Sequence, residues 1–335
     1  MIKIIVDAFG GDKSPDANID GAIMALNELN DVEITLFGDE NIIKEKLGSR
    51  KYDESRIKIV HAPEVITCDE QPSMATFRKK NSSLMKSLDA LKDDPSYAGM
   101  VSLSSTGSLL MGSIMKVRKI DGVIRPACLP LIPTMAGTVV GVCDSGANVD
   151  CSKEELLQFA IMGSTFLKCC YNIESPKVAL LNIGVEEIKG DNLRKETYPL
   201  LKECESINFV GNMESRDLLS GNYDLVVADG FSGNVLIKAT EGTSIEFLKM
   251  LKKMCTKSFK NKMGAALLKK DIMDVKENMN PNNCGGALLI GLKRIVVKGH
   301  GSSSARSVKE CIKQVYELNK NDFINKVTLE LSKAI

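Results

Sequence analysis

Short apolar runs alternate with helical stretches along the whole chain, and this alternation limits the folds that the chain can adopt. Apolar runs between amphipathic segments are typical of βα units, whose strands align in parallel. We expect strands at residues 2–6, 32–37, 57–60, 100–103, 139–143, 177–182, 207–210, 224–228 and 295–298. We expect helices between them, for example at residues 74–91, 109–119, 153–170, 193–204 and 304–320. The pattern predicts an α/β fold on a mainly parallel sheet.

The length of 335 residues suits either one large α/β unit or two average domains. We expect residues 1–335 to form a single large α/β domain, with a helical segment at about residues 240–280 projecting from it. The formal net charge is only +1, from 44 basic and 43 acidic residues. This balance argues against a surface that coats nucleic acid as a whole, so a charged partner must meet a local patch.

The cysteines and histidines do not indicate a metal site. Ten cysteines lack any C-x-x-C pair, and the chain has only two histidines, so a zinc site of the usual spacing is not expected. The first residues read as a strand rather than as the apolar region of a signal peptide. We therefore expect reduced thiols and a cytoplasmic protein.

Small polar loops follow six of the expected strands. In open α/β sheets, ligands bind outside the carboxyl ends of the strands. Glycine lets the backbone approach a ligand, and the N–H groups at a helix N-terminus favour an anion such as phosphate. Each loop taken alone is equally compatible with an ordinary turn. Together they predict one large polar site, formed by residues 7–12, 104–108, 144–148, 182–184, 229–234 and 299–304.

Cations and one histidine lie close to these loops. The run Arg78-Lys-Lys-Asn-Ser-Ser83 combines charges, an amide and hydroxyls that can hold an oxyanion, although such a run is often a solvated face. Lys189 follows the strand at residues 177–182 by a short loop. His300 lies between glycines ahead of a serine-rich helix start, a setting suited to proton exchange with a bound anion. The chain contains no G-x-S-x-G elbow, P-loop or dinucleotide fingerprint.

Taken in order, these segments resemble one known family. The resemblance rests on Val6-Asp-Ala-Phe-Gly-Gly-Asp12, Arg78 to Ser83, Ser105-Thr-Gly107, Gly146-Ala-Asn-Val-Asp150, Lys189-Gly190, Asp229-Gly-Phe-Ser-Gly-Asn234 and His300-Gly-Ser-Ser303. The chain is similar from about residue 2 to residue 320 to the bacterial phosphate acyltransferases of phospholipid synthesis, the PlsX family. This resemblance implies a three-layer α/β/α, Rossmann-like fold similar to isopropylmalate dehydrogenases and phosphotransacetylases.

The resemblance also implies an activity and partners. It implies transfer of a fatty acyl group from acyl carrier protein to inorganic phosphate, which gives an acyl phosphate for a downstream glycerol-3-phosphate acyltransferase. No cofactor, metal or nucleic acid is implied. The expected protein is a homodimer at the inner face of the cell membrane.

We assign site residues from the chemistry of the loops and from the family resemblance. We expect Lys189 and Asn234 to stabilise the reaction's oxyanion, with His300 assisting. Asn234 as a helix cap and Lys189 as a surface partner of Glu186 or Glu187 are the structural alternatives. Phosphate or substrate binding is assigned to Arg78, Lys79, Asn81, Ser82, Thr106, Asp144, Asn148, Asp229 and Ser302.

The near-zero net charge of the chain hides a strongly basic segment near residue 260. Residues 249–270 hold eight lysines and no acid, which leaves the rest of the chain with a net charge of −7. Basic amphipathic segments lie on anionic bilayers, and an acidic carrier protein could dock on the same lysines. We expect membrane contact through an apolar tip that contains Met263, Ala266, Leu267 and Leu268.

Three other functions remain open at this stage. A coenzyme A-dependent phosphate acetyltransferase or butyryltransferase is chemically close. A metal- and NAD-dependent hydroxyacid dehydrogenase would need an aspartate ligand where this chain has Asn234. A non-catalytic membrane or partner-binding module would use only the basic segment.

Overall fold

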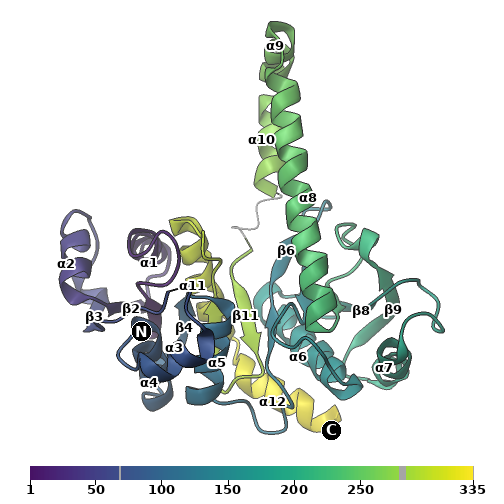
Figure 1. The fold of residues 1–335 in the computed structure, drawn as a ribbon, viewed down its shortest axis with the longest axis horizontal. Helices are drawn as coiled ribbons and strands as arrows, with labels where there is room; N and C mark the ends of the chain where they lie inside the picture. The colour runs from purple at the N-terminus through teal and green to yellow at the C-terminus, as the bar shows by residue number, and fades with distance from the viewer. Residues whose placement is uncertain (68, 279–283, 335) are drawn as a thin grey trace.

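The computed structural model describes residues 1–67, 69–278 and 284–334. Two β-sheets lie side by side, and helices flank each of them (Figure 1). The predicted α/β class with mainly parallel strands is confirmed. The strands are nevertheless divided between two sheets, whereas the sequence pattern alone led us to expect one.

The first sheet has seven strands in the order β3-β2-β1-β4-β12-β11-β5. β11 is antiparallel to both of its neighbours, and the other strand pairs are parallel. The strands are β1 (Ile2–Asp7), β2 (Val32–Gly38), β3 (Ile57–His61), β4 (Tyr97–Ser102), β5 (Ala127–Leu129), β11 (Ala287–Ile290) and β12 (Ile295–Lys298).

The second sheet has five strands in the order β6-β7-β10-β8-β9. Only β6 is antiparallel to its neighbour, β7. The strands are β6 (Leu131–Pro133), β7 (Val139–Cys143), β8 (Lys177–Asn182), β9 (Asn208–Glu214) and β10 (Leu225–Val227).

Helices cover both faces of each sheet. The first sheet lies between α1 (Asp16–Glu28) with α11 (Ala305–Lys320) and α4 (Ser83–Asp93) with α5 (Thr106–Lys116). The second lies between α6 (Lys153–Tyr171) with α7 (Asn192–Glu203) and the first turns of α8 (Gly230–Thr256). The remaining helices are α2 (Glu40–Gly48), α3 (Pro72–Arg78), α9 (Phe259–Leu267), α10 (Lys269–Asn278) and α12 (Phe323–Ala334).

The strands are apolar on both faces because both faces are covered. In β1, Ile4 and Val6 belong to one core cluster and Ile5 to another, since successive side chains point to opposite sides of a strand. The first cluster also contains Leu225 of β10 and Phe159 of α6. One continuous core therefore joins the two sheets.

Every strand expected from the apolar runs is present, with ends displaced by at most four residues. The strands that the pattern did not predict are β5, β6 and β11. They have only three or four residues each, and Pro126, Pro130 and Pro133 bracket the first two. These are also the strands that form the antiparallel pairs, so no βα alternation marks them.

The helix expected at residues 74–91 is instead two helices, and this prediction was wrong. Residues 79–82 separate α3 from α4. Ser82 is extended, and its Oγ accepts a hydrogen bond from the Met85 N–H at 3.3 Å, so it caps α4. Serine and asparagine favour such caps because their side chains compete with the helical backbone for hydrogen bonds.

A helical arm rises from the second sheet in Figure 1. α8 extends outward from the sheet, α9 lies at its far end, and α10 runs back beside it. Of the segment expected to project, residues 279 and 280 lie outside the described residues. Within the described part of the chain, no helix is both long and apolar enough to cross a membrane.

Candidate active site

The six polar loops divide equally between the two sheets. The loops after β1, β4 and β12 lie at the carboxyl ends of parallel strands in the first sheet. The loops after β7, β8 and β10 lie at the corresponding end of the second sheet. We therefore describe two loop clusters rather than the single sheet edge expected from the sequence.

Asp7 organises the first cluster. Its buried carboxylate accepts hydrogen bonds from Ser102 Oγ at 2.7 Å and Ser104 Oγ at 3.0 Å. Asn18 Nδ2 donates to the carbonyl of Asp7 at 2.8 Å. The Asp12 N–H donates to the carbonyl of Gly301 at 2.8 Å, which ties in the loop after β12. These bonds hold three strand ends in a fixed relation.

His300 and Ser302 are exposed in that last loop. The Ser302 N–H donates to His300 Nδ1 at 3.2 Å, and Ser302 Oγ lies 2.9 Å from the same nitrogen. Because a backbone N–H can only donate, Nδ1 is an acceptor and the neutral ring carries its proton on Nε2. His300 therefore presents an N–H donor outward.

Arg78 and Lys79, two cations of the run at residues 78–83, differ in their surroundings. Lys79 Nζ is bound to Glu70 at 2.6 Å and to the carbonyl of Val65 at 2.8 Å. The hydrogen bond from Lys79, and to a smaller extent that from the Thr67 N–H, lowers the pKa of Glu70 to about 2. Arg78 is exposed at the end of α3 and has no side-chain partner among the described residues. Only Arg78 of this pair is available to a ligand.

The polar residues after Lys79 mainly hold backbone. Ser82 is buried and caps α4, and the Asn81 N–H donates to Glu64 Oε2 at 3.1 Å. Thr106, half-buried, is the first residue of α5, whose N-cap is Ser105. The N-terminal N–H groups of α5 thus begin at Thr106.

Asp144 is the centre of the second cluster. Its buried carboxylate accepts hydrogen bonds from the N–H groups of Cys128, Ser145, Ala147 and Asn148, and from Asn148 Nδ2. Burial raises the pKa of Asp144, and the four backbone donors oppose that rise. Asn148 Nδ2 also donates to the carbonyl of Pro126 at 2.9 Å. The Asp144 carboxylate and the Asn148 amide nitrogen are therefore engaged by the protein and hold these loops in place.

The start of α8 packs closely against this centre. A Cβ on Gly233 would collide with the carbonyl oxygen of Asp144, so only glycine fits there. Asp229 caps α8, because its Oδ1 accepts the Ser232 N–H at 2.9 Å. Its Oδ2 is ion-paired with Arg194 Nη2. Although burial acts to raise it, the Ser232 N–H and Arg194 hold the pKa of Asp229 below its usual value.

Lys189 and Asn234 are both exposed, Lys189 in the loop after β8 and Asn234 in the first turns of α8. Asn182 Nδ2 donates to the carbonyl of Lys189 at 3.1 Å and so fixes its loop to β8. Asn234 faces the turn at Gly146, where a Cβ would lie 3.6 Å from its amide. Asn234 does not cap the helix, since Asp229 does so.

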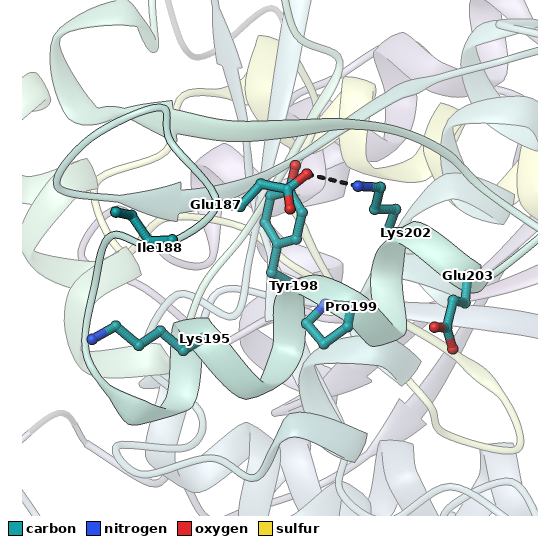
Figure 2. Close-up of a pocket in the computed structure, with 7 residues that line it drawn as sticks. All are labelled: Glu187, Ile188, Lys195, Tyr198, Pro199, Lys202 and Glu203. Carbon is teal, nitrogen blue, oxygen red and sulfur yellow. Dashed lines mark hydrogen bonds and ion pairs between the residues drawn. The ribbon is translucent and has the colours of Figure 1, made fainter.

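The surface ion pair considered for Lys189 is not present. Glu187 is paired with Lys202 at 2.7 Å, and no ion pair joins Lys189 to Glu186 in the described part of the chain, although Glu186 lies near it at Gly184. Figure 2 shows that pair beside a pocket of about 750 Å³ on the outer face of α7. The pocket is lined by Glu187, Ile188, Lys195, Tyr198, Pro199, Lys202 and Glu203, none of which we assigned to the site.

Known proteins that resemble this chain show its family. A family model described as fatty acid synthesis protein matches residues 2–326. The phosphate acyltransferase of Clostridium perfringens strain SM101 is 42% identical over 332 residues, which cover 99% of this chain and 97% of that protein. The chain belongs to the phosphate acyltransferase family. Its Listeria innocua relative, also named phosphate acyltransferase, is 42% identical over 333 residues and the same shares of both chains.

Two solved structures are similar in fold to this chain. A phosphotransacetylase from Streptococcus pyogenes has a TM-score of 0.59 at 15% identity, covering 97% of this chain and 94% of that one. A branched-chain phosphotransacylase from Enterococcus faecalis V583 has a TM-score of 0.58 at 15% identity, covering 95% and 99%. The family membership makes the chain an acyltransferase whose substrates are phosphate and an acyl donor.

Two structurally important residues of this chain were not predicted from the sequence. Asp7 ends the first strand and lay inside a quoted loop, but nothing in the sequence showed that two serines from β4 and its loop would bind it. Arg194 is ten residues after the loop at residues 182–184 and carries no recognisable pattern. In the described residues, no group of three or more potential ligands could hold a metal ion.

Proposed function

We propose that the chain transfers a fatty acyl group from acyl carrier protein to inorganic phosphate. The observation that carries the proposal is the division of the expected cations into ion-paired and unpaired side chains. Lys79 and Arg194 are held in ion pairs, whereas Arg78 and Lys189 are exposed without a partner among the described residues. Two cations without an ion-pair partner among the described residues, together with helix N-termini at the loop clusters, suit a dianion.

The reaction needs no protein nucleophile. Phosphate is largely a dianion near neutral pH, if its second pKa is about 6, as for phosphate esters. A phosphate oxygen attacks the thioester carbon, the C–O bond forms, the C–S bond breaks, and the thiolate leaves. Catalysis then consists of holding the phosphate against the thioester and stabilising the oxyanion.

The proposed roles follow from the contacts. Lys189 supplies positive charge, Asn234 an amide donor and His300 its Nε2–H, and these three are the proposed catalytic residues. Thr106 and Ser302 bind phosphate from the first cluster, and Arg78 binds it from the end of α3. The residues whose side chains are engaged by protein contacts position the loops, namely Lys79, Ser82, Asp144, Asn148 and Asp229. The exposed side chain of Asn81 is proposed to bind phosphate beside Arg78.

The donor decides between the main proposal and its nearest alternative. We expect acyl phosphate to form from phosphate and palmitoyl-acyl carrier protein at least tenfold faster than from palmitoyl-coenzyme A at equal concentration. Measuring phosphate consumption with both thioesters in parallel tests this. Faster reaction with coenzyme A thioesters would favour a phosphotransacetylase-type activity instead, and no reaction with either would favour a non-catalytic module.

We further propose that the arm tip, residues 259–270, contacts an anionic membrane. Its apolar side chains are exposed, with Leu267 at 87%, and Lys260, Lys262, Lys269 and Lys270 flank them. Near an anionic surface each lysine contributes about 1 kcal/mol. Met263, Ala266, Leu267 and Leu268 would enter the interface, which makes the protein cytoplasmic and peripheral.

A double substitution in the tip tests the membrane proposal. Leu267→Glu with Leu268→Glu should weaken binding to phosphatidylserine-containing vesicles by about tenfold or more, because two acidic groups would oppose the anionic surface. Vesicle cosedimentation measures it. The matched control is Leu329→Glu on α12, since Leu329 and Leu268 are both 56% exposed. Equal binding by the tip variant and the control would contradict the proposal.

The remaining expectations concern partners. We propose that the chain works as a homodimer and that its acyl phosphate product passes to a glycerol-3-phosphate acyltransferase at the membrane. An acyl phosphate is a reactive mixed anhydride, so consumption close to the site of formation limits its loss to hydrolysis.

A further inference from the structure

A groove of about 820 Å³ runs along the lower part of α8. Its walls come from the loop after β8, the start of α7, the segment after β9 and one face of α8. The volume is within the usual range of about 300–1,000 Å³ for small-molecule sites. Its lining includes Leu181, Asn182, Ile183, Gly190, Arg194, Leu218, Leu219, Phe231, Ser232, Val235, Leu236, Ala239, Thr240 and Thr243.

One end of this groove adjoins the second loop cluster. Asn182 lines it and also binds the carbonyl of Lys189 at 3.1 Å. Arg194 and Ser232 line the same end and contact each other at 3.0 Å. A ligand whose polar head lies at the Lys189 loop can therefore continue into the groove without leaving the protein surface.

The rest of the groove is largely apolar, although Ser215, Arg216 and Ser244 also line it. Phe231 and Val235 of α8 and Ile183 of the β8 loop are each more than half exposed. Small side chains follow at Ala239, Thr240 and Thr243, so α8 leaves space along this face. Exposed apolar side chains in a row, next to a polar site, are typical of a surface that binds an apolar ligand.

The same face of α8 continues beyond the groove. Val235, Ala239 and Thr243 are followed by the exposed Phe247, Met250 and Met254. The spacings of three and four residues keep these positions on one side of a helix. The apolar face therefore extends from the loop cluster towards the tip of the arm.

We propose that this groove holds the acyl chain of the donor, an inference that rests on the proposed acyl transfer to phosphate. The stretch from Phe231 to Thr243 rises about 18 Å along α8. A long-chain acyl group spans about 15 Å, half of a bilayer's ~30 Å hydrocarbon core. A short acyl group fills only the end beside Lys189. The groove thus selects long chains and leaves the thioester at the loop cluster.

Filling the groove with a large side chain tests the proposal. Ala239→Trp should lower the ratio of kcat/KM for palmitoyl-acyl carrier protein over butyryl-acyl carrier protein by roughly tenfold or more. The tryptophan occupies the space of the distal carbons, which butyryl does not reach. Thr243→Trp, one turn farther out, should act in the same direction and more weakly.

The control is Lys238→Trp, which places the same bulk at the adjacent exposed position outside the groove lining. It should keep the wild-type ratio. A ratio unchanged in Ala239→Trp and Thr243→Trp, or an equal loss for both chain lengths, overturns the acyl groove. Circular dichroism and sedimentation velocity check folding and oligomeric state in each variant.

A binding measurement separates this proposal from the activity itself. By calorimetry, wild-type protein should bind palmitoyl-acyl carrier protein more tightly than butyryl-acyl carrier protein, and Ala239→Trp should remove most of that difference. If no variant makes acyl phosphate but the difference is present, the proposed reaction fails and the groove stands. If wild type shows no difference, the groove proposal fails.

Discussion

Lys189→Ala is expected to lower kcat/KM for acyl phosphate formation by about 10²–10³-fold, the usual cost of losing one group that stabilises an oxyanion. Lys189 is exposed, fixed through Asn182 to the end of β8, and free of ion pairs among the described residues. Its charge is therefore available to the reacting phosphate and thioester. Asn234→Ala should cause a loss of the same order, since an amide donor on the first turns of α8 disappears. Initial rates of phosphate consumption measure both.

A nearby lysine supplies the control. Lys202→Ala removes a charge from α7, but that charge is already neutralised by Glu187 at 2.7 Å. We expect less than about a twofold change, because exposed ion pairs contribute roughly 0–1 kcal/mol. Near-normal rates in folded Lys189→Ala and Asn234→Ala proteins would remove both residues from the proposed mechanism.

Arg194→Met is expected to lower the free energy of unfolding by about 3–5 kcal/mol, a large part of the ~5–15 kcal/mol typical of a folded protein. The side chains of Arg194 and Asp229 are only 11% and 9% exposed. Removing the guanidinium leaves the Asp229 carboxylate buried without its countercharge. Urea denaturation followed by circular dichroism measures the change.

A control variant and a rescue variant test whether the loss of stability comes from the buried ion pair. Lys202→Met breaks an ion pair whose partners are 60% and 56% exposed, so the loss should stay below about 1 kcal/mol. Asp229→Asn in the Arg194→Met background should recover part of the stability, because asparagine also caps a helix and carries no charge. If Arg194→Met lost no more than the Lys202→Met control, the buried pair would not stabilise the α8 start.

The same pair makes stability depend on acid. The pKa of Asp229 is lower in the folded protein than its ordinary value of about 4. Its contribution is therefore complete above that ordinary value and is lost as pH falls through the folded pKa. The stability difference between wild type and Arg194→Met should consequently narrow as the pH falls below about 4. A constant difference down to pH 2 would contradict this linkage.

The strands and the loops could be predicted because their evidence is local. Consecutive residues are enough to predict a strand such as Ile2 to Val6 and the glycine-rich turn that follows it. The short antiparallel strands β5, β6 and β11 could not be predicted, since their partners are remote in sequence. Their pairing is decided by the sheets around them.

The sequence near a charged residue did not show whether its side chain is available to a ligand. Arg78 and Lys79 are adjacent and chemically alike, yet only Lys79 is held by Glu70 and Val65. Asp144 and Asp229 were both assigned to substrate, but one is saturated by backbone donors and the other by Ser232 and Arg194. Which side chains remain available to a ligand depends on partners far along the chain.

The sequence by itself determined the α/β class, the positions of the polar loops and the family, because each is written in short segments and their order. Only the tertiary structure decided that the loops divide between two sheets, that Lys189 has no ion pair within the described residues, and that α8 leaves a groove beside it. These features arise where segments distant in sequence meet. Burial and ion pairing there remove some polar groups from solvent and leave others exposed to bind substrate.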